Sequence, residues 1–179
     1  DIQAGAKINL GKDEAVGVFL GTDAATRVQA NGVRINDAGS IMNIGDNSYG
    51  YVLKGRGTTF TNSSSGSVTL GTKSVYLYSD DTTGNITNNV ALTSNGSTAG
   101  TALTSATGGQ NYGLYSAGTV VNNSQLTSTG SKNYGLYSAG TVINNANINY
   151  GSGVGNVGIY SIYGGTAVNS GNARIAVGA

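Results

Sequence analysis

The chain has 179 residues, of which 30 are glycine, and it contains no proline, cysteine, histidine or tryptophan. Charged residues make up 9% of the chain and nearly cancel, leaving a formal net charge of +1. This balance argues against a nucleic-acid partner, which needs a basic stripe, and eleven tyrosines argue against a disordered chain. The lack of proline favours strands that are hydrogen-bonded along both edges, because proline cannot donate to a strand ladder.

A ten-residue segment that occurs twice defines the repeat of the chain. Residues 111–120 recur letter for letter as residues 133–142, so the repeat is 22 residues long. A period in the low twenties is typical of solenoids, in which each repeat buries its apolar face only against its neighbours. The repeat therefore predicts a stacked architecture.

Three short motifs follow one another along the chain. A Gly-Leu-Tyr element, with variations, begins at six places: Gly17, Gly50, Tyr76, Gly113, Gly135 and Gly158. Each is followed by an apolar or β-branched residue that precedes an asparagine, at Asn36, Asn62, Asn88, Asn122, Asn144 and Asn169. A third motif is a short alternating strand, as in residues 8–10, 68–70, 126–127 and 147–149. The order is constant, which favours three strands in every repeat.

These motifs predict an all-β protein, a parallel β-helix of about six coils with three short strands per coil, formed by residues 1–179 as a single segment. The alternative suggested by composition is an antiparallel sandwich or barrel. That fold predicts hairpin spacings of roughly 8 to 12 residues and no identical 22-residue repeat. Two insertions lengthen the repeats and are expected to form loops, one near residues 20–31 and one near residues 97–109.

Side chains of the first strand in each coil are expected to alternate between two faces. Leu114 and Leu136 are assigned to the core, together with Tyr112 and Tyr134. The opposite face is expected to carry the glycines of the motif beside one tyrosine per coil, and these tyrosines are Tyr78, Tyr115, Tyr137 and Tyr160. Such a column either shields strand edges or provides a stacking platform for sugar rings or a partner protein. The four tyrosines are the candidate binding residues.

The asparagines of the second motif predict a structural ladder. Asparagine tolerates left-handed turn conformations, and its amide can bond the equivalent amide one coil above and below. The predicted members are Asn36, Asn62, Asn88, Asn122, Asn144 and Asn169.

Few residues are suited to catalysis or metal binding. Without histidine and cysteine the chain lacks the usual general base, nucleophile pairs and zinc ligands. The pair Asp80-Asp81 is the one cue for glycoside hydrolysis, but a turn explains it more simply. Calcium at the acidic residues lacks the support of a Gly-Gly-x-Gly-x-Asp repeat. We therefore expect no enzyme activity, no catalytic residue, no metal and no cofactor.

The Tyr-Gly-Leu-Tyr-Ser and Thr-Val-Val-Asn-Asn elements of residues 112–123, repeated with one change at 134–145, resemble the passenger repeats of bacterial type V autotransporters. The likeness is greatest to the very large adhesins of fusobacteria, and it departs from their pattern at Tyr76 and in the two insertions. The resemblance implies a right-handed β-helix, displayed on the outer surface of a Gram-negative bacterium or secreted, that binds host or bacterial cells in virulence. The resemblance places a membrane barrel elsewhere in a longer chain. Separately, no apolar run here reaches the roughly 18 residues of a membrane helix.

Three functions are consistent with this pattern. The first is a segment of a surface adhesin whose partner is a host-cell or bacterial surface protein or glycan. The second is a structural spacer of the same protein with no binding site of its own. The third is a polysaccharide-active β-helix enzyme. The sequence begins and ends within the pattern, so we also expect a fragment of a longer passenger that tends to stack end to end.

Overall fold

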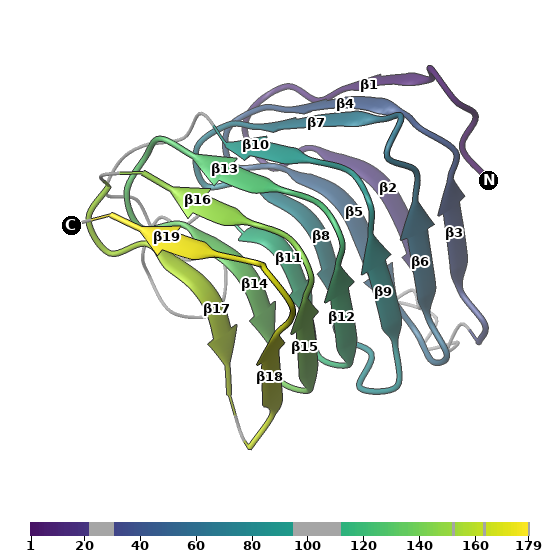
Figure 1. Ribbon diagram of the computed structural model, residues 1–179. Helices are drawn as coiled ribbons and strands as arrows, with labels where there is room; N and C mark the ends of the chain where they lie inside the picture. The colour runs from purple at the N-terminus through teal and green to yellow at the C-terminus, as the bar shows by residue number, and fades with distance from the viewer. Residues whose placement is uncertain (22–30, 95–111, 152, 163, 179) are drawn as a thin grey trace.

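The computed structural model describes residues 1–179 except 22–30, 95–111, 152, 163 and 179. The described part consists of nineteen β-strands and their turns, with no helix, and the strands pair in parallel in three sheets (Figure 1). Successive strands pass from sheet to sheet, and each strand pairs with its counterpart one coil later. The chain is therefore a right-handed parallel β-helix, as the sequence predicts.

Each sheet collects one strand from every coil. Sheet 1 contains β1 (Lys7–Asn9), β4 (Ile41–Ile44), β7 (Ser67–Leu70), β10 (Leu92–Ser94), β13 (Leu126–Ser128), β16 (Ile148–Tyr150) and β19 (Ile175–Val177). Sheet 2 contains β2 (Val16–Gly21), β5 (Tyr49–Lys54), β8 (Val75–Ser79), β11 (Tyr112–Ser116), β14 (Tyr134–Ser138) and β17 (Val157–Ser161). Sheet 3 contains β3 (Arg34–Asp37), β6 (Thr59–Asn62), β9 (Asn85–Asn88), β12 (Thr119–Asn122), β15 (Thr141–Asn144) and β18 (Thr166–Asn169). Six coils result, and β19 opens a seventh.

The duplicated segment aligns with itself without a shift. Tyr112 pairs with Tyr134 and Leu114 with Leu136, and in sheet 3 Asn122 pairs with Asn144. Because side chains in a strand alternate between faces, this register stacks every apolar residue on its copy in the next coil. The strand positions match the three motifs of the sequence.

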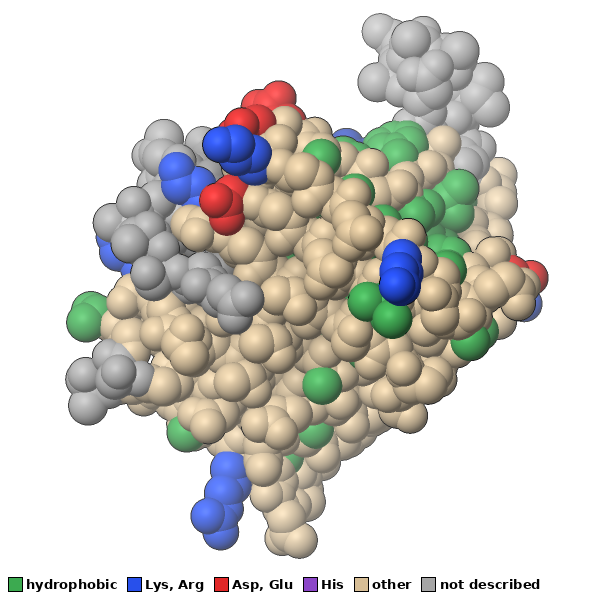
Figure 2. All heavy atoms as spheres, turned by 90° about the horizontal axis from the view of Figure 1, so that it is seen from above, with side chains coloured by type: hydrophobic (Ala, Val, Ile, Leu, Met, Phe, Trp, Pro, Cys, Tyr) green, Lys and Arg blue, Asp and Glu red, His purple; other side chains and the backbone are tan. Residues whose placement is uncertain are grey.

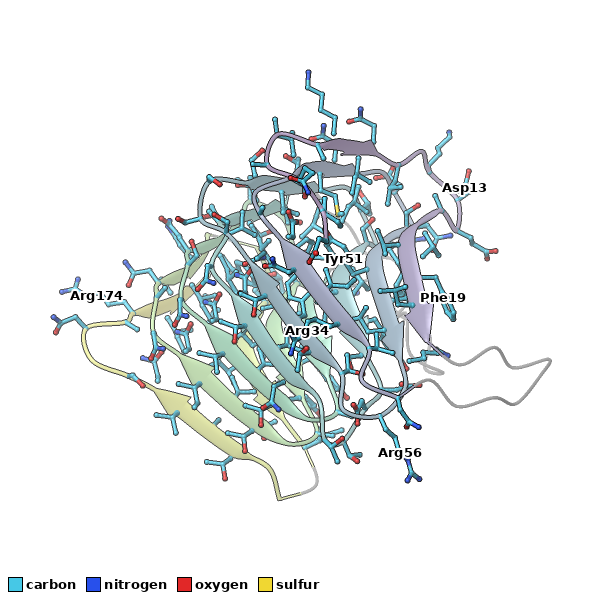
Figure 3. All side chains as sticks on the ribbon, turned by 90° about the vertical axis from the view of Figure 1, so that its right-hand side faces the viewer. Asp13, Phe19, Arg34, Tyr51, Arg56 and Arg174 are labelled. Carbon is cyan, nitrogen blue, oxygen red and sulfur yellow. The ribbon has the colours of Figure 1, made fainter. Side chains whose placement is uncertain are left out.

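The core fills the space enclosed by the three sheets. Its fully buried residues include Leu77, Leu114 and Leu136 of sheet 2, as expected. In the second and third coils the core contains three aromatic rings. Tyr51, Phe60 and Tyr76 pack edge to face there, with ring centroids 5.1 to 6.1 Å apart. Figure 3 shows Tyr51 inside the coil, whereas Phe19 lies on the outer side of β2.

The strands of sheet 2 do not alternate as predicted, because two consecutive residues of β14 both face the core. A Cβ atom on Gly135 would point inward, 3.2 Å from the Tyr150 hydroxyl and 3.3 Å from Leu126 Cδ1. Gly135 and Leu136 therefore both face the core, and the assignment of the glycines to the outer face is wrong. The placement of Tyr134 in the core is also wrong, since this residue turns outward and is only half-buried.

Tyr76 takes the place of this glycine in the third coil and follows the same inward direction. Its ring is fully buried, and its hydroxyl accepts a hydrogen bond of 2.9 Å from Asn62 Nδ2. Burial raises the pKa of the Tyr76 phenol well above its ordinary value. The departure from the motif is thus a core substitution, not a change on the surface.

A second set of glycines allows close packing at the corner between sheets 2 and 3. A Cβ atom on Gly140 would come within 2.5 Å of the Gly118 carbonyl oxygen, and one on Gly118 or Gly165 would meet the neighbouring coil in the same way. Side chains are therefore excluded where the coils stack. The two predicted insertions fall almost entirely on residues 22–30 and 95–111, which lie outside the described residues.

Candidate functional site

The register of sheet 2 stacks one outward-facing position of each strand on the same position of the next strand, and most residues at this position are aromatic. Tyr78, Tyr115, Tyr137 and Tyr160 pair in sequence across β8, β11, β14 and β17. Val52 and Phe19 hold the same position in the two preceding coils. The side chain of Tyr115 lies outside the described residues, and the other three tyrosines define the chemistry of this face.

A cluster of three tyrosines lies on the outer face of β14 and β17. The Tyr137 and Tyr160 rings stack, with centroids 5.0 Å apart and planes 20° apart. Tyr134 contacts both edge-on, with centroids 6.0 Å from Tyr137 and 5.6 Å from Tyr160. Tyr160 keeps 40% of its surface exposed, and the other two are half-buried. We call these three residues the tyrosine cluster.

Tyr134 is the member of the cluster that reasoning from the sequence missed. Strict alternation along the strand assigns Tyr134 and Leu136 to one face, which put Tyr134 in the core. The glycine before Leu136 is no signal for this change of face, because Tyr76 stands at the same position in the third coil and also faces the core.

The same face has a different chemistry nearer the N-terminus. The Tyr78 ring is half-buried, and the Lys54 ammonium lies 5.9 Å from its centroid, in the geometry of a cation–π contact. Beyond Thr82 the only charged residues of the chain are Lys132 and Arg174. The tyrosine cluster therefore lies in the weakly charged half of the rod. Figure 2 looks onto the sheet 1 side of the rod, where backbone and neutral polar side chains cover most of the surface and charges form a few separate groups.

Five of the six predicted ladder asparagines form one hydrogen-bonded column inside sheet 3. The Nδ2 atom of each donates to the Oδ1 atom of the next, through Asn62, Asn88, Asn122, Asn144 and Asn169, over 2.7 to 2.9 Å. The last four also donate to a backbone carbonyl at the following corner. We call this column the inner ladder.

Asn36 does not belong to the inner ladder, and the prediction is wrong there. Asn36 pairs with Thr61 and is exposed, and Asp37 pairs with Asn62 at the ladder position. Asp37 is buried and accepts hydrogen bonds from the Ser40 hydroxyl at 2.6 Å and from the Tyr51 hydroxyl at 2.9 Å. Burial raises the pKa of the Tyr51 phenol, and the neighbouring Asp37 carboxylate raises it further.

A second amide column, which was not predicted, runs outside the first. Asn145 Nδ2 donates to Asn123 Oδ1 over 2.8 Å, and Asn123 Nδ2 donates to Asn89 Oδ1 over 3.0 Å. All its amide-to-amide bonds point toward the N-terminus, opposite to those of the inner ladder. We call it the outer ladder. The doubled asparagines at 88–89, 122–123 and 144–145 were its signal in the sequence.

The two carboxylates of Asp80-Asp81 occupy different environments. Asp80 is exposed, whereas Asp81 is buried and accepts bonds from the Thr58 amide at 2.7 Å and the Thr83 amide at 2.8 Å. Burial alone would raise the pKa of Asp81, but the hydrogen bonds from Thr58 and Thr83 outweigh it and lower the pKa. Asp81 thus caps the turn between β8 and β9 through Thr83, and it links this turn to the preceding coil through Thr58.

Neither a cluster of metal ligands nor a membrane-spanning helix is found in the described part of the chain. Within the described ranges, no three acidic side chains gather as ligands for a metal ion. The same residues contain no helix with the length and apolarity needed to span a bilayer. No family model, curated protein or solved structure matches the chain.

Proposed function

We propose that this chain is a segment of a bacterial autotransporter passenger displayed at the cell surface, and that it acts in adhesion through the tyrosine cluster. The observation that carries the proposal is the gathering of three tyrosine rings on the outer face of sheet 2. Tyrosine combines an apolar face with a polar hydroxyl and is enriched in binding surfaces. The expected partner is a glycan or protein on a host cell or another bacterium.

The weak charge of this half of the rod supports that kind of partner. Attraction between opposite charges contributes little where only Lys132 and Arg174 are charged. Binding would depend instead on stacking against the rings and on hydrogen bonds to neutral groups. The rigid sheet beneath holds Tyr137 and Tyr160 in a parallel stack before any ligand arrives, which lowers the entropy lost on binding.

The test is binding of the labelled 179-residue chain to a glycan panel, epithelial cells and other bacteria. The variant Tyr137→Ala/Tyr160→Ala is expected to lose saturable binding by at least about tenfold, consistent with the energies of aromatic anchors. Phe19→Ala is the matched control, because Phe19 holds the same column in the first coil and is 51% exposed. Equal loss in both variants, or no loss in either, would reject the cluster as the binding site.

A structural spacer is the second candidate function, and the inner ladder favours it. Its four amide bonds link five coils along the rod without a break. Such a column stiffens the rod whether or not its surface binds anything. A spacer predicts that the folded parent chain binds no member of the panel.

A further inference from the structure

An open groove lies along the corner between sheets 3 and 1. It has a volume of about 420 Å³ and spans three successive corners, those that join β12 to β13, β15 to β16 and β18 to β19. Its lining residues are neutral, and most carry carboxamide or small side chains: Asn123, Ser124, Gln125, Asn145, Ala146, Asn147, Asn172 and Ala173. The groove runs across coils on a different part of the rod from the tyrosine cluster.

The two walls of the groove are columns of amide side chains. One wall is the outer ladder, in which Asn145 donates to Asn123 over 2.8 Å. The other begins with Gln125 and Asn147, the residues immediately before β13 and β16. Leu126 pairs with Ile148 in sheet 1, so Gln125 and Asn147 stand one above the other. Amides thus recur at the spacing of the coils, roughly 4.8 Å.

The floor of the groove is fixed from inside the rod. The Ser124 carbonyl accepts a bond of 2.8 Å from Asn122 Nδ2, and the Ala146 carbonyl accepts one of 2.7 Å from Asn144 Nδ2. These donors belong to the inner ladder, so the backbone beneath the groove is held in one conformation. The small side chains of the floor leave the space between the walls open.

The same corner one coil earlier lacks the second wall. There Val90 and Ala91 stand where Ser124 and Gln125 stand in the next coil, and Val90 is buried. An apolar floor residue and an alanine wall offer few hydrogen bonds. The groove is therefore a local feature of the last three corners and not a consequence of the repeat alone.

Part of the hydrogen-bonding capacity of the groove is unused. Gln125 and Asn172 are exposed, and among the described residues neither side chain has a hydrogen-bond partner in the protein. A carboxamide offers both donors and acceptors, which matches the hydroxyl groups of a sugar, since each hydroxyl also donates and accepts. An ionic ligand would lose hydration without a counter-charge in the lining, and a peptide would find no apolar pocket deeper than an alanine methyl.

We propose that this groove binds a neutral oligosaccharide, which lies along the rod axis with successive sugar units at successive corners. The free amides of Gln125 and Asn172 hydrogen-bond its hydroxyl groups, and Ala146 lies beneath its central part. This site does not depend on the tyrosine cluster, and it would exist in a spacer as well as in an adhesin.

The experiment is titration of the 179-residue chain with neutral oligosaccharides of four to six units, including glucose, mannose, galactose and N-acetylglucosamine polymers. Calorimetry gives the affinity, and backbone amide NMR shifts give the location. We expect binding by the parent chain and at least a tenfold loss in Gln125→Ala/Asn172→Ala. Both residues are exposed, so the variant is expected to stay folded. Asn85→Ala removes an exposed amide on the outer face of sheet 3, outside the groove, and is expected to bind like the parent.

Two further variants separate the alternatives. Ala146→Trp fills the floor and is expected to abolish binding, whereas Arg174→Gln removes the nearby cation, which extends away from the rod in Figure 3, and is expected to change nothing. Loss of binding in Arg174→Gln, or binding of acidic sugars alone, would show an anionic ligand and overturn the proposal. So would failure of every neutral oligosaccharide to bind, or equal binding by the parent and Gln125→Ala/Asn172→Ala. The variant Tyr137→Ala/Tyr160→Ala leaves the groove intact. Its loss of binding to cells therefore tests the tyrosine cluster separately from the oligosaccharide groove.

Discussion

Replacing Asn122 by alanine tests whether the inner ladder stabilises the rod. Asn122 is fully buried and makes three side-chain hydrogen bonds. It accepts from Asn88 Nδ2 at 2.9 Å, and it donates to the Ser124 carbonyl and to Asn144 Oδ1, each at 2.8 Å. At about 1 kcal/mol for each net hydrogen bond, Asn122→Ala is expected to lower the free energy of unfolding by about 3 kcal/mol. The groups left unpaired in the interior add to this loss.

The matched control is Asn145→Ala in the outer ladder. Asn145 is exposed and donates one hydrogen bond to Asn123, so the expected loss is at most about 1 kcal/mol. Both variants are unfolded in urea and followed by the circular dichroism of the strands, with the parent chain alongside. If Asn122→Ala and Asn145→Ala lose the same free energy, the buried column contributes no more than the solvated one, and the stabilising role of the inner ladder is refuted.

Asn122→Asp tests the direction of the hydrogen bonds in the inner ladder, that is, which atoms donate and which accept. An ionised carboxylate cannot donate, so both donated bonds are lost and its oxygen faces Asn144 Oδ1. Burial against acceptors is expected to raise the pKa of this aspartate in the folded state above its unfolded value. The stability of Asn122→Asp relative to the parent is then expected to recover as the pH falls below the raised value. A deficit that does not change between pH 7 and pH 4 would contradict the assigned donors.

Three further predictions concern the glycines, the capping aspartate and the buried phenols. Gly135→Ala places a Cβ atom 2.6 Å from the Gly158 carbonyl oxygen and is expected to lose about 2 kcal/mol in urea unfolding, whereas Gly11→Ala, with nothing within 4 Å, is expected to lose little. Asp81 has a lowered pKa, so its contribution is present above the unfolded value of 3.8 and disappears as the pH falls through the folded value. Asp81→Asn is therefore expected to be less stable at pH 7 and to lose less on acidification, as unfolding at pH 7 and pH 3 would show. Alkaline titration at the phenolate absorbance is expected to leave Tyr76 un-ionised until the chain unfolds, because burial raises its pKa. A reversible titration of every phenol in the folded chain would contradict that burial.

The coil organisation could be predicted because it depends on spacing alone. An exact 22-residue repeat fixes which residues stack, whatever the details of each turn. The pairs Leu114 with Leu136 and Asn122 with Asn144 follow directly from it. Periodicity of this kind survives insertions, since an added loop does not change the register of the strands on either side.

The face of each side chain within a strand could not be predicted equally well. Alternation assumes a regular strand, but the consecutive residues Gly135 and Leu136 face the same side. Tyr134 consequently joins Tyr137 on the outer face and forms part of the candidate site. The groove escaped prediction for a different reason, because its walls come from corners 22 or more residues apart that only the stacked structure brings together.

In the first coil the ladder position is occupied by Asp37 and not by Asn36, which explains why the amide column begins at Asn62. Each ladder asparagine donates to the next one toward the C-terminus, and an ionised aspartate cannot make that bond because it is an acceptor only. Asn62 Oδ1 instead accepts from the Asn89 backbone amide at 2.5 Å. Asp37 receives donors from its own coil and the next, namely Ser40 and Tyr51. An aspartate at the ladder position therefore keeps the register of sheet 3 but does not extend the hydrogen-bonded column.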